Sequence, residues 1–236
     1  MKTQILCCCI AIMLWTAPVV SAQSKWKVPD NMKQLTGYIK VPVFADVKDA
    51  PGLARVLIIG DSISMYYTPE VRRLLAGKVN VYRVPDNGKS TMYGLKNIED
   101  WLGDGNWAVI HFNFGLHDIV VMPTGQHQVP IEDYGKNLRQ LIKRFRATNA
   151  KLIWAATTPV PEGSSNRHEE DVLAYNAAAR KIMAENGIPI DDLHAFAEAS
   201  KDRATMNWPK NVHFRAEGSA ALAEEVTSHI LVVLGK

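Results

Sequence analysis

Residues 55–64 read RVLIIGDSIS, a run of aliphatic side chains that passes directly into Gly-Asp-Ser. Such a run predicts a strand that is buried on both faces of a parallel sheet. Gly60 permits a sharp turn at its end, and residues 69–75 predict a helix with Pro and Glu in its first turn. Ser62 is therefore expected at the carboxyl edge of the sheet, where open α/β folds bind ligands, as a candidate nucleophile. The alternative is that Ser62 only caps a helix.

Further strands and helices alternate along the chain. Four more strands are predicted, the last of them short: 79–84, 107–114, 151–158 and 188–190. Apolar residues recur at helical spacing in three later segments: 136–146, 172–187 and 216–233. This alternation predicts a three-layer α/β/α sandwich with a flavodoxin-like, mostly parallel five-stranded sheet.

Polar or glycine-containing segments follow the predicted strands. Asn87-Gly88 follows the second strand, and Gly115-Leu116-His117-Asp118 follows the third. Near the C-terminus, His213 shortly precedes the last predicted helix. If the strands are parallel, Ser62, Gly88 and His117 lie along one edge of one sheet.

In this order the segments resemble the conserved blocks of the SGNH (GDSL-type) hydrolase family, over nearly the whole mature chain. Gly60-Asp61-Ser62 resembles the nucleophile block, and Gly88 resembles the glycine of the second block. Gly115-Leu116-His117-Asp118 resembles the Gly-x-Asn-Asp block, and His213 resembles the catalytic histidine. The resemblance implies a serine esterase without a cofactor. Ser62 would attack an ester carbonyl while His213 removes and later returns a proton.

The same resemblance implies the other site residues. The amides of Ser62 and Gly88, with a side-chain donor from the third block, would form the oxyanion hole, and Asp61 and Asp118 would support the site. His117 stands where the family has asparagine, but an imidazole N–H can also donate to an oxyanion. The alternative is that His117 only braces its loop through Asp118.

A second departure concerns the group that orients His213. The family's acid lies three residues before the histidine, where this chain has Lys210, and the nearer Asn211 carries no charge. The resemblance allows a Ser-His dyad oriented by a backbone carbonyl. The alternative is an acid from elsewhere in the chain.

The N-terminal residues predict export. Residues 1–22 combine Lys2, an apolar run too short to span a bilayer, and a cleavage site ending at Ala22. All three cysteines lie at 7–9, inside this segment, so the mature chain would have no disulfide. Lipid attachment to one of them is an alternative, although their surroundings make a poor lipobox. We expect a periplasmic or secreted protein without a stable membrane anchor, with an arm at 23–52 and the hydrolase domain at 53–236.

Charge and histidine spacing exclude other classes of protein. The formal net charge of +3 gives no case for nucleic-acid binding. The histidines show no HExxH pattern and no paired Cys-His ligands, so no metal is expected. His229 is expected on the surface of the last helix. The sequence gives no indication of oligomeric state.

Aromatic residues near the blocks bear on the substrate. Four of them would stack on a sugar, line an acyl pocket or only pack loops: Tyr66, Tyr67, Tyr93 and Trp208. The polar loop 161–167 favours a substrate with a hydrophilic alcohol group. We therefore expect hydrolysis of small acyl esters, mainly acetyl, on a small molecule or a glycan. The alternatives are a lysophospholipase or thioesterase, and a non-catalytic carbohydrate-binding relic.

Overall fold

The computed structural model describes residues 43–44 and 47–236. The predicted signal peptide (1–22) and most of the predicted arm (23–52) lie outside the described residues. Within the described part, five strands form one parallel sheet in the order β2-β1-β3-β4-β5. The strands are β1 (Arg55–Ile59), β2 (Asn80–Arg83), β3 (Val109–Phe112), β4 (Lys151–Ala155) and β5 (Ile190–Asp191).

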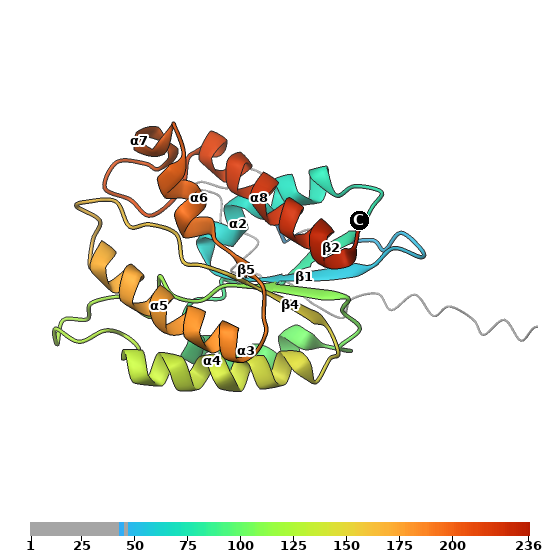
Figure 1. Cartoon of the computed structure of the whole chain (residues 1–236), viewed down its shortest axis with the longest axis horizontal. Helices are drawn as coiled ribbons and strands as arrows, with labels where there is room; N and C mark the ends of the chain where they lie inside the picture. The colour runs from blue at the N-terminus through green and yellow to red at the C-terminus, as the bar shows by residue number, and fades with distance from the viewer. Residues whose placement is uncertain (1–42, 45–46) are drawn as a thin grey trace, which may run out of the picture.

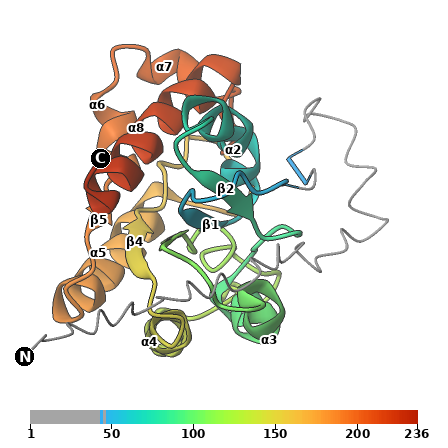
Figure 2. The same ribbon diagram turned by 90° about the vertical axis from the view of Figure 1, so that its right-hand side faces the viewer.

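Helices cover both faces of the sheet. They are α2 (Ser62–Leu74), α3 (Thr91–Leu102), α4 (Ile131–Arg146), α5 (Glu169–Glu185), α6 (Leu193–Ala199), α7 (Arg203–Met206) and α8 (Ala216–Leu234). In Figure 1 the helices α2, α6, α7 and α8 lie above the sheet and α3, α4 and α5 below it, and Figure 2 shows the same layers from the side. The predicted three-layer sandwich with a parallel five-stranded sheet is confirmed.

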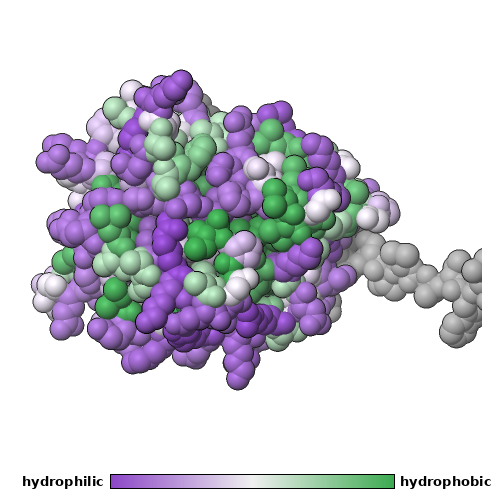
Figure 3. Space-filling view, viewed as in Figure 1, coloured by the Kyte–Doolittle hydropathy of each residue, from purple (hydrophilic) through white to green (hydrophobic). Residues whose placement is uncertain are grey.

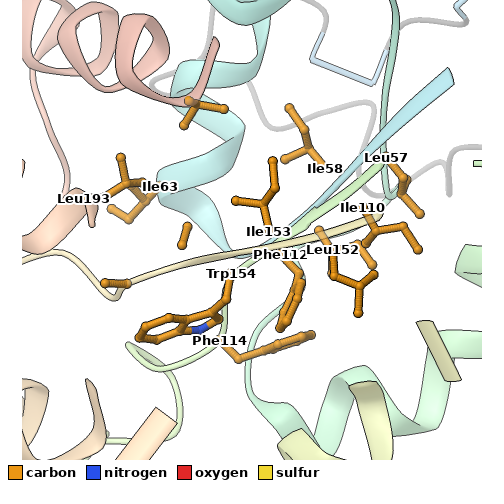
Figure 4. Close-up of a cluster of buried hydrophobic side chains, with 14 of the residues drawn as sticks. Leu57, Ile58, Ile63, Ile110, Phe112, Phe114, Leu152, Ile153, Trp154 and Leu193 are labelled. Carbon is orange, nitrogen blue, oxygen red and sulfur yellow. The ribbon is translucent and has the colours of Figure 1, made fainter. Parts of the chain in front are cut away.

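The core forms because the central strands are apolar on both faces. Leu57, Ile110 and Leu152 are register partners on β1, β3 and β4, and all three are buried. Figure 4 shows these side chains together with the aromatic rings that extend the cluster below the sheet. Outside this core the face seen in Figure 3 is mostly hydrophilic, and hydrophobic side chains show mainly in a band between the two helical layers.

The start of α2 differs from the sequence prediction. The helix begins at Ser62 rather than near Pro69, which lies inside it. Asp61 is the N-cap, and its side chain accepts a hydrogen bond from the N–H of Ile63 at 2.9 Å. This cap satisfies one of the free amides of the first turn and fixes the start of the helix upstream of the proline. Because α2 starts directly at the end of the β1 turn, Ser62 occupies its first position.

Helix α3 was not predicted, although the sequence contains a cap for it. The Ser90 side chain accepts a hydrogen bond from the N–H of Tyr93. The buried face of α3 includes Gly94, whose lack of a side chain lets the helix approach Phe114: an added Cβ would lie 2.6 Å from that ring. A small residue at this point is therefore needed for α3 to pack.

We expect Gly94→Ala and Gly135→Ala, both within helices, to change stability in opposite directions. Alanine at position 94 would overlap Phe114 and destabilise the fold by about 1–3 kcal/mol. At position 135 in α4 an added Cβ meets only Ile182, at 3.7 Å, so the higher helix propensity of alanine should add about 0.5–1 kcal/mol. Urea unfolding measures both, and a stabilised Gly94→Ala variant would refute the packing argument.

Candidate active site

The fold brings Ser62 and His213 together from opposite ends of the domain. The Oγ of Ser62 lies 2.8 Å from the Nε2 of His213, a hydrogen-bond distance. Asp61 is the cap of α2, so the alternative in which Ser62 serves only as a cap does not hold. A serine hydroxyl that donates to an imidazole is the arrangement of a nucleophile and its general base.

Asn211 supplies the group that orients His213. Its side-chain oxygen Oδ1 lies 2.7 Å from the Nδ1 of His213 and also accepts the backbone N–H of His213 at 2.9 Å. Neither alternative from the sequence, a backbone carbonyl or a distant acid, describes this contact. The site is thus a Ser-His-Asn arrangement, with an amide in the place of the usual carboxylate.

The double role of the Asn211 oxygen fixes the tautomer of His213. A backbone N–H is always a donor, so the atom of Asn211 that faces it must be the oxygen and not the NH₂ group. The same oxygen then requires a proton on Nδ1, which leaves a lone pair on Nε2 toward Ser62. The neighbouring Lys210 has a φ of 54° and its side chain lies against Gly163, so it leaves the orienting position to Asn211.

The surroundings of His213 keep it neutral. Burial lowers its pKa from the ordinary value, the Asp61 carboxylate opposes this shift, and the positive charge of Arg167 adds to it. A lowered pKa means that the unprotonated base is present at neutral pH and persists in mildly acidic solution.

A buried arginine holds the nucleophile turn in place. Arg83, at the end of β2, is 4 % exposed. Its Nη2 donates to the carbonyl oxygens of Gly60 at 2.8 Å and Asp61 at 3.0 Å. Its Nη1 donates to those of Val84 at 2.8 Å and Asp86 at 2.6 Å. Burial lowers the pKa of Arg83 to about 10, so it stays charged at neutral pH and ties the turn after β1 to the turn after β2.

Gly88 lies directly against the nucleophile turn. Its N–H donates to the carbonyl oxygen of Gly60 at 2.9 Å, and a Cβ at this position would lie 2.6 Å from that oxygen. Only glycine allows so close an approach of the two backbones. The structure therefore brings Gly88 to the expected place. Its role as an oxyanion donor stays a prediction. In that role the Gly88 N–H would donate to the oxyanion and to the carbonyl oxygen of Gly60 at the same time.

Asp118 and His117 have separate surroundings. Asp118 is buried and accepts the backbone N–H of Thr91 at 2.9 Å and its hydroxyl at 2.5 Å, so it links the third block to the start of α3. Burial raises the pKa of Asp118 to about 7, against these hydrogen bonds. For His117, burial lowers the pKa, the nearby Asp61 raises it, and the positive charges of Arg167 and Lys89 lower it further. His117 thus lies within electrostatic reach of the Ser62 turn and is neutral at pH 7.

The aromatic residues named from the sequence divide into two groups. The ring of Tyr66 lies 5.5 Å from that of His213, and Trp208, which is 45 % exposed, donates its backbone N–H to the carbonyl of His213. Tyr67 is buried, and Tyr93 donates its hydroxyl to Asp86. Tyr66 and Trp208 are therefore the two of these residues that contact His213.

Comparison with known proteins agrees with this geometry. The family model of the GDSL-like lipase/acylhydrolase family matches residues 58–221. The chain belongs to this family. It is a serine ester hydrolase of the SGNH/GDSL type, and residues 58–221 contain all the blocks discussed above.

Solved structures of GDSL hydrolases share the fold at low identity. A lipase/acylhydrolase from Enterococcus faecalis has a TM-score of 0.66 at 17% identity, over 75% of this chain and 95% of that one. The acetyl xylan esterase AlAXEase has a TM-score of 0.64 at 18% identity, over 75% and 99%. A variant of an acetyl xylan esterase from Geobacillus stearothermophilus has 0.62 at 17%, over 77% and 94%. No curated protein matches the sequence significantly.

We expect substitutions of Asn211 to separate its two effects in this GDSL hydrolase. Asn211→Ala should lower kcat by roughly 10²-fold, because Nδ1 loses the acceptor that fixes its tautomer. Asn211→Asp keeps the acceptor and adds a negative charge, which should raise the pKa of His213 and move the acid limb of kcat/KM to higher pH. In the wild type that limb should fall below about pH 6.5.

The measurement is the pH dependence of ester hydrolysis for the three proteins. Lys210→Ala is the matched control, because the Lys210 side chain lies against Gly163. An Asn211→Ala variant with the turnover of the wild type would show that Asn211 does not orient His213.

Proposed function

We propose that this GDSL hydrolase is an exported esterase that removes acetyl or other small acyl groups from carbohydrate. The observation that carries the catalytic part is the continuous hydrogen-bonded line from the Ser62 hydroxyl through His213 to Asn211, with distances of 2.8 and 2.7 Å. This line contains a nucleophile, a base and an orienting group, so it disfavours the alternative of a non-catalytic binding relic.

The reaction follows from the proton positions. Ser62 Oγ attacks the ester carbonyl as its proton moves to Nε2 of His213, and a tetrahedral oxyanion forms. The imidazolium then gives this proton to the departing alcohol oxygen, which leaves an acyl-serine. Water, deprotonated by Nε2, attacks the acyl carbon, and the proton returns to Ser62 as the carboxylic acid leaves.

Stabilisation of the oxyanion is assigned to donors around Ser62. The amide of Ser62, the first residue of α2, has no acceptor within its own helix and lies at the positive end of the helix dipole. His117 is neutral, so one of its ring nitrogens carries a proton that it can donate. Gly88 would add a third donor by sharing its N–H.

The substrate assignment is supported by the surface around His213. An exposed indole at Trp208, with the Arg215 guanidinium 4.8 Å from its ring centroid, offers a flat face of the kind on which sugars stack. The polar loop 161–167 borders the site, because Gly163 contacts Lys210 and Arg167 donates to the carbonyl of Leu116 at 2.6 Å. Two of the structures similar in fold are acetyl xylan esterases.

A lysophospholipase or thioesterase activity is the second candidate. Met92 at the start of α3 is 59 % exposed, and Met122 in the segment after the third block is 40 % exposed. Exposed, flexible apolar side chains of this kind would favour contact with a longer acyl chain.

Export and partners are also part of the proposal. The N-terminal sequence supports cleavage near Ala22 and release into a periplasm or the medium, with a small-molecule or glycan ester as the partner and no nucleic acid. No helix in the described part of the chain has the length and hydropathy that a membrane crossing requires.

We expect His117→Ala to lower kcat by about 10²–10³-fold with little change in KM, because an oxyanion donor acts mainly in the transition state. His117→Asn restores a side-chain donor and should recover most of this loss. If His117 only braces its loop, both variants should instead lose thermal stability together and asparagine should restore nothing. Melting temperatures measured beside the kinetics separate these outcomes.

A series of p-nitrophenyl esters from acetate to palmitate tests the substrate class. We expect hydrolysis to be fastest for acetate, to fall with chain length and to be lost in Ser62→Ala, since no other group replaces the nucleophile. Release of acetate from acetylated polysaccharide then tests the carbohydrate part. Rates that rise with chain length would favour the lipid or thioester candidate, and Ser62-independent turnover would exclude the proposed mechanism.

A further inference from the structure

A polar cluster lies on the α8 side of the sheet, separate from the Ser62–His213 line. Asp191, the last residue of β5, and His111 of β3 are both fully buried, and the Nε2 of His111 lies 2.8 Å from the Oδ2 of Asp191. From α8, the Nδ1 of His229 lies 3.4 Å from the other oxygen of Asp191, Oδ1, and 3.6 Å from Oε1 of Glu225. Four titratable side chains from three elements therefore meet at one place.

Two histidines face the two carboxylates of this cluster. Among the described residues, the ion pairs of Asp191 involve only the histidines 111 and 229, and those of Glu225 only His229. Asp191 and Glu225 thus share His229, which is partly exposed. In addition, Oδ1 of Asp191 is buried and accepts no hydrogen bond from the described residues. A buried carboxylate oxygen without a donor is costly unless a cation lies beside it.

The ligand atoms fit a divalent metal ion. One oxygen of Asp191, one of Glu225 and one nitrogen of His229 all lie within 4.8 Å of one another. Atoms at this separation can be bound by one ion with bonds of about 2.0–2.2 Å after small side-chain movements. Two carboxylates and an imidazole suit Zn²⁺ and similar transition metals, whereas Mg²⁺ and Ca²⁺ prefer oxygen ligands alone.

Neighbouring groups orient the three candidate ligands, as they do in metal sites. His111 donates to Oδ2 of Asp191 and so leaves Oδ1 toward α8, as outer partners commonly orient a ligating carboxylate. Glu225 and His229 lie four residues apart on α8, so their side chains are neighbours on the same face of the helix, about one turn apart. The Nδ1 of His229 lies 3.1 Å from the carbonyl of Glu225, and it would bind an ion once its proton moves to Nε2.

We propose that Asp191, Glu225 and His229 bind one structural transition-metal ion, with Zn²⁺ as the best match, which links β5 to α8. Helix α8 begins at Ala216, three residues after His213. An ion that fixes α8 on the sheet therefore stabilises the helix that follows directly after the catalytic histidine. This ion takes no part in the ester hydrolysis, and the sequence prediction of no metal concerned only local ligand motifs.

Metal binding to the whole protein, stripped with a chelator and dialysed, tests the site. Equilibrium dialysis against ZnCl₂ with elemental analysis should give one equivalent bound, and Co²⁺ should give a visible d–d spectrum. With Zn²⁺ at a hundred times its dissociation constant, the melting temperature should rise by about 5–10 °C. His229→Gln and Glu225→Gln should each weaken Zn²⁺ binding by about 100-fold or more.

His194→Gln is the matched control. His194 also contacts a carboxylate, with its Nε2 2.7 Å from Oε1 of Glu169, but among the described residues this pair has no third ligand within reach of one ion. This variant should bind Zn²⁺ like the wild type. The proposal is overturned if wild type binds less than one equivalent of both Zn²⁺ and Co²⁺, or if His229→Gln and Glu225→Gln bind them as tightly as His194→Gln does. Because every readout is independent of ester hydrolysis, the result does not depend on the proposed function.

Discussion

The buried guanidinium of Arg83 is the interaction on which the geometry of the catalytic edge depends. In a parallel sheet the turns after neighbouring strands diverge, and their carbonyl groups lose the partners that the strands provided. Arg83 supplies fixed donors to the carbonyls on both sides of this divergence, after β1 and after β2. Without them the carbonyls of Gly60 and Asp61 would keep the amides of Gly88 and Met65 as donors, but those of Val84 and Asp86 would lose the arginine that joins the two turns.

The site is notable for which of its groups are neutral. Burial lowers the pKa values of His213 and His117, and Asn211 is uncharged, so the negative charge that acts on both histidines is the carboxylate of Asp61. Asp61 raises the pKa of both histidines and therefore favours the imidazolium that forms during the reaction. Part of the electrostatic work of a triad acid thus comes from the residue that caps α2, while Asn211 provides the orientation.

The features that the sequence could predict are those set by local pattern. The apolar run of β1, the Gly-Asp-Ser turn and the histidine before α8 are each visible within a few residues, so the sheet and the Ser62–His213 pair were found. No orienting role was predicted for Asn211, because that role depends on a local backbone turn. The turn places the side-chain oxygen of Asn211 beside two nitrogens of His213, the backbone N and Nδ1. The predicted start of α2 near Pro69 was wrong. Proline is common in the first turn of a helix, but here the Asp61 side chain caps the helix further upstream, at Ser62. The contacts of Arg83 with Gly60 and Asp61, and that of Asp191 with His111, depend on the order of the strands.

The contact between Asn211 and His213 also has an evolutionary consequence. The oxygen that orients the imidazole belongs to an amide, and the carboxylate of aspartate has the same shape and can accept the same two hydrogen bonds. The codons for asparagine and aspartate differ at a single base. A point mutation can therefore add or remove a full charge beside the general base while the backbone turn stays as it is, so the pH range of this enzyme is open to selection without any rebuilding of its fold.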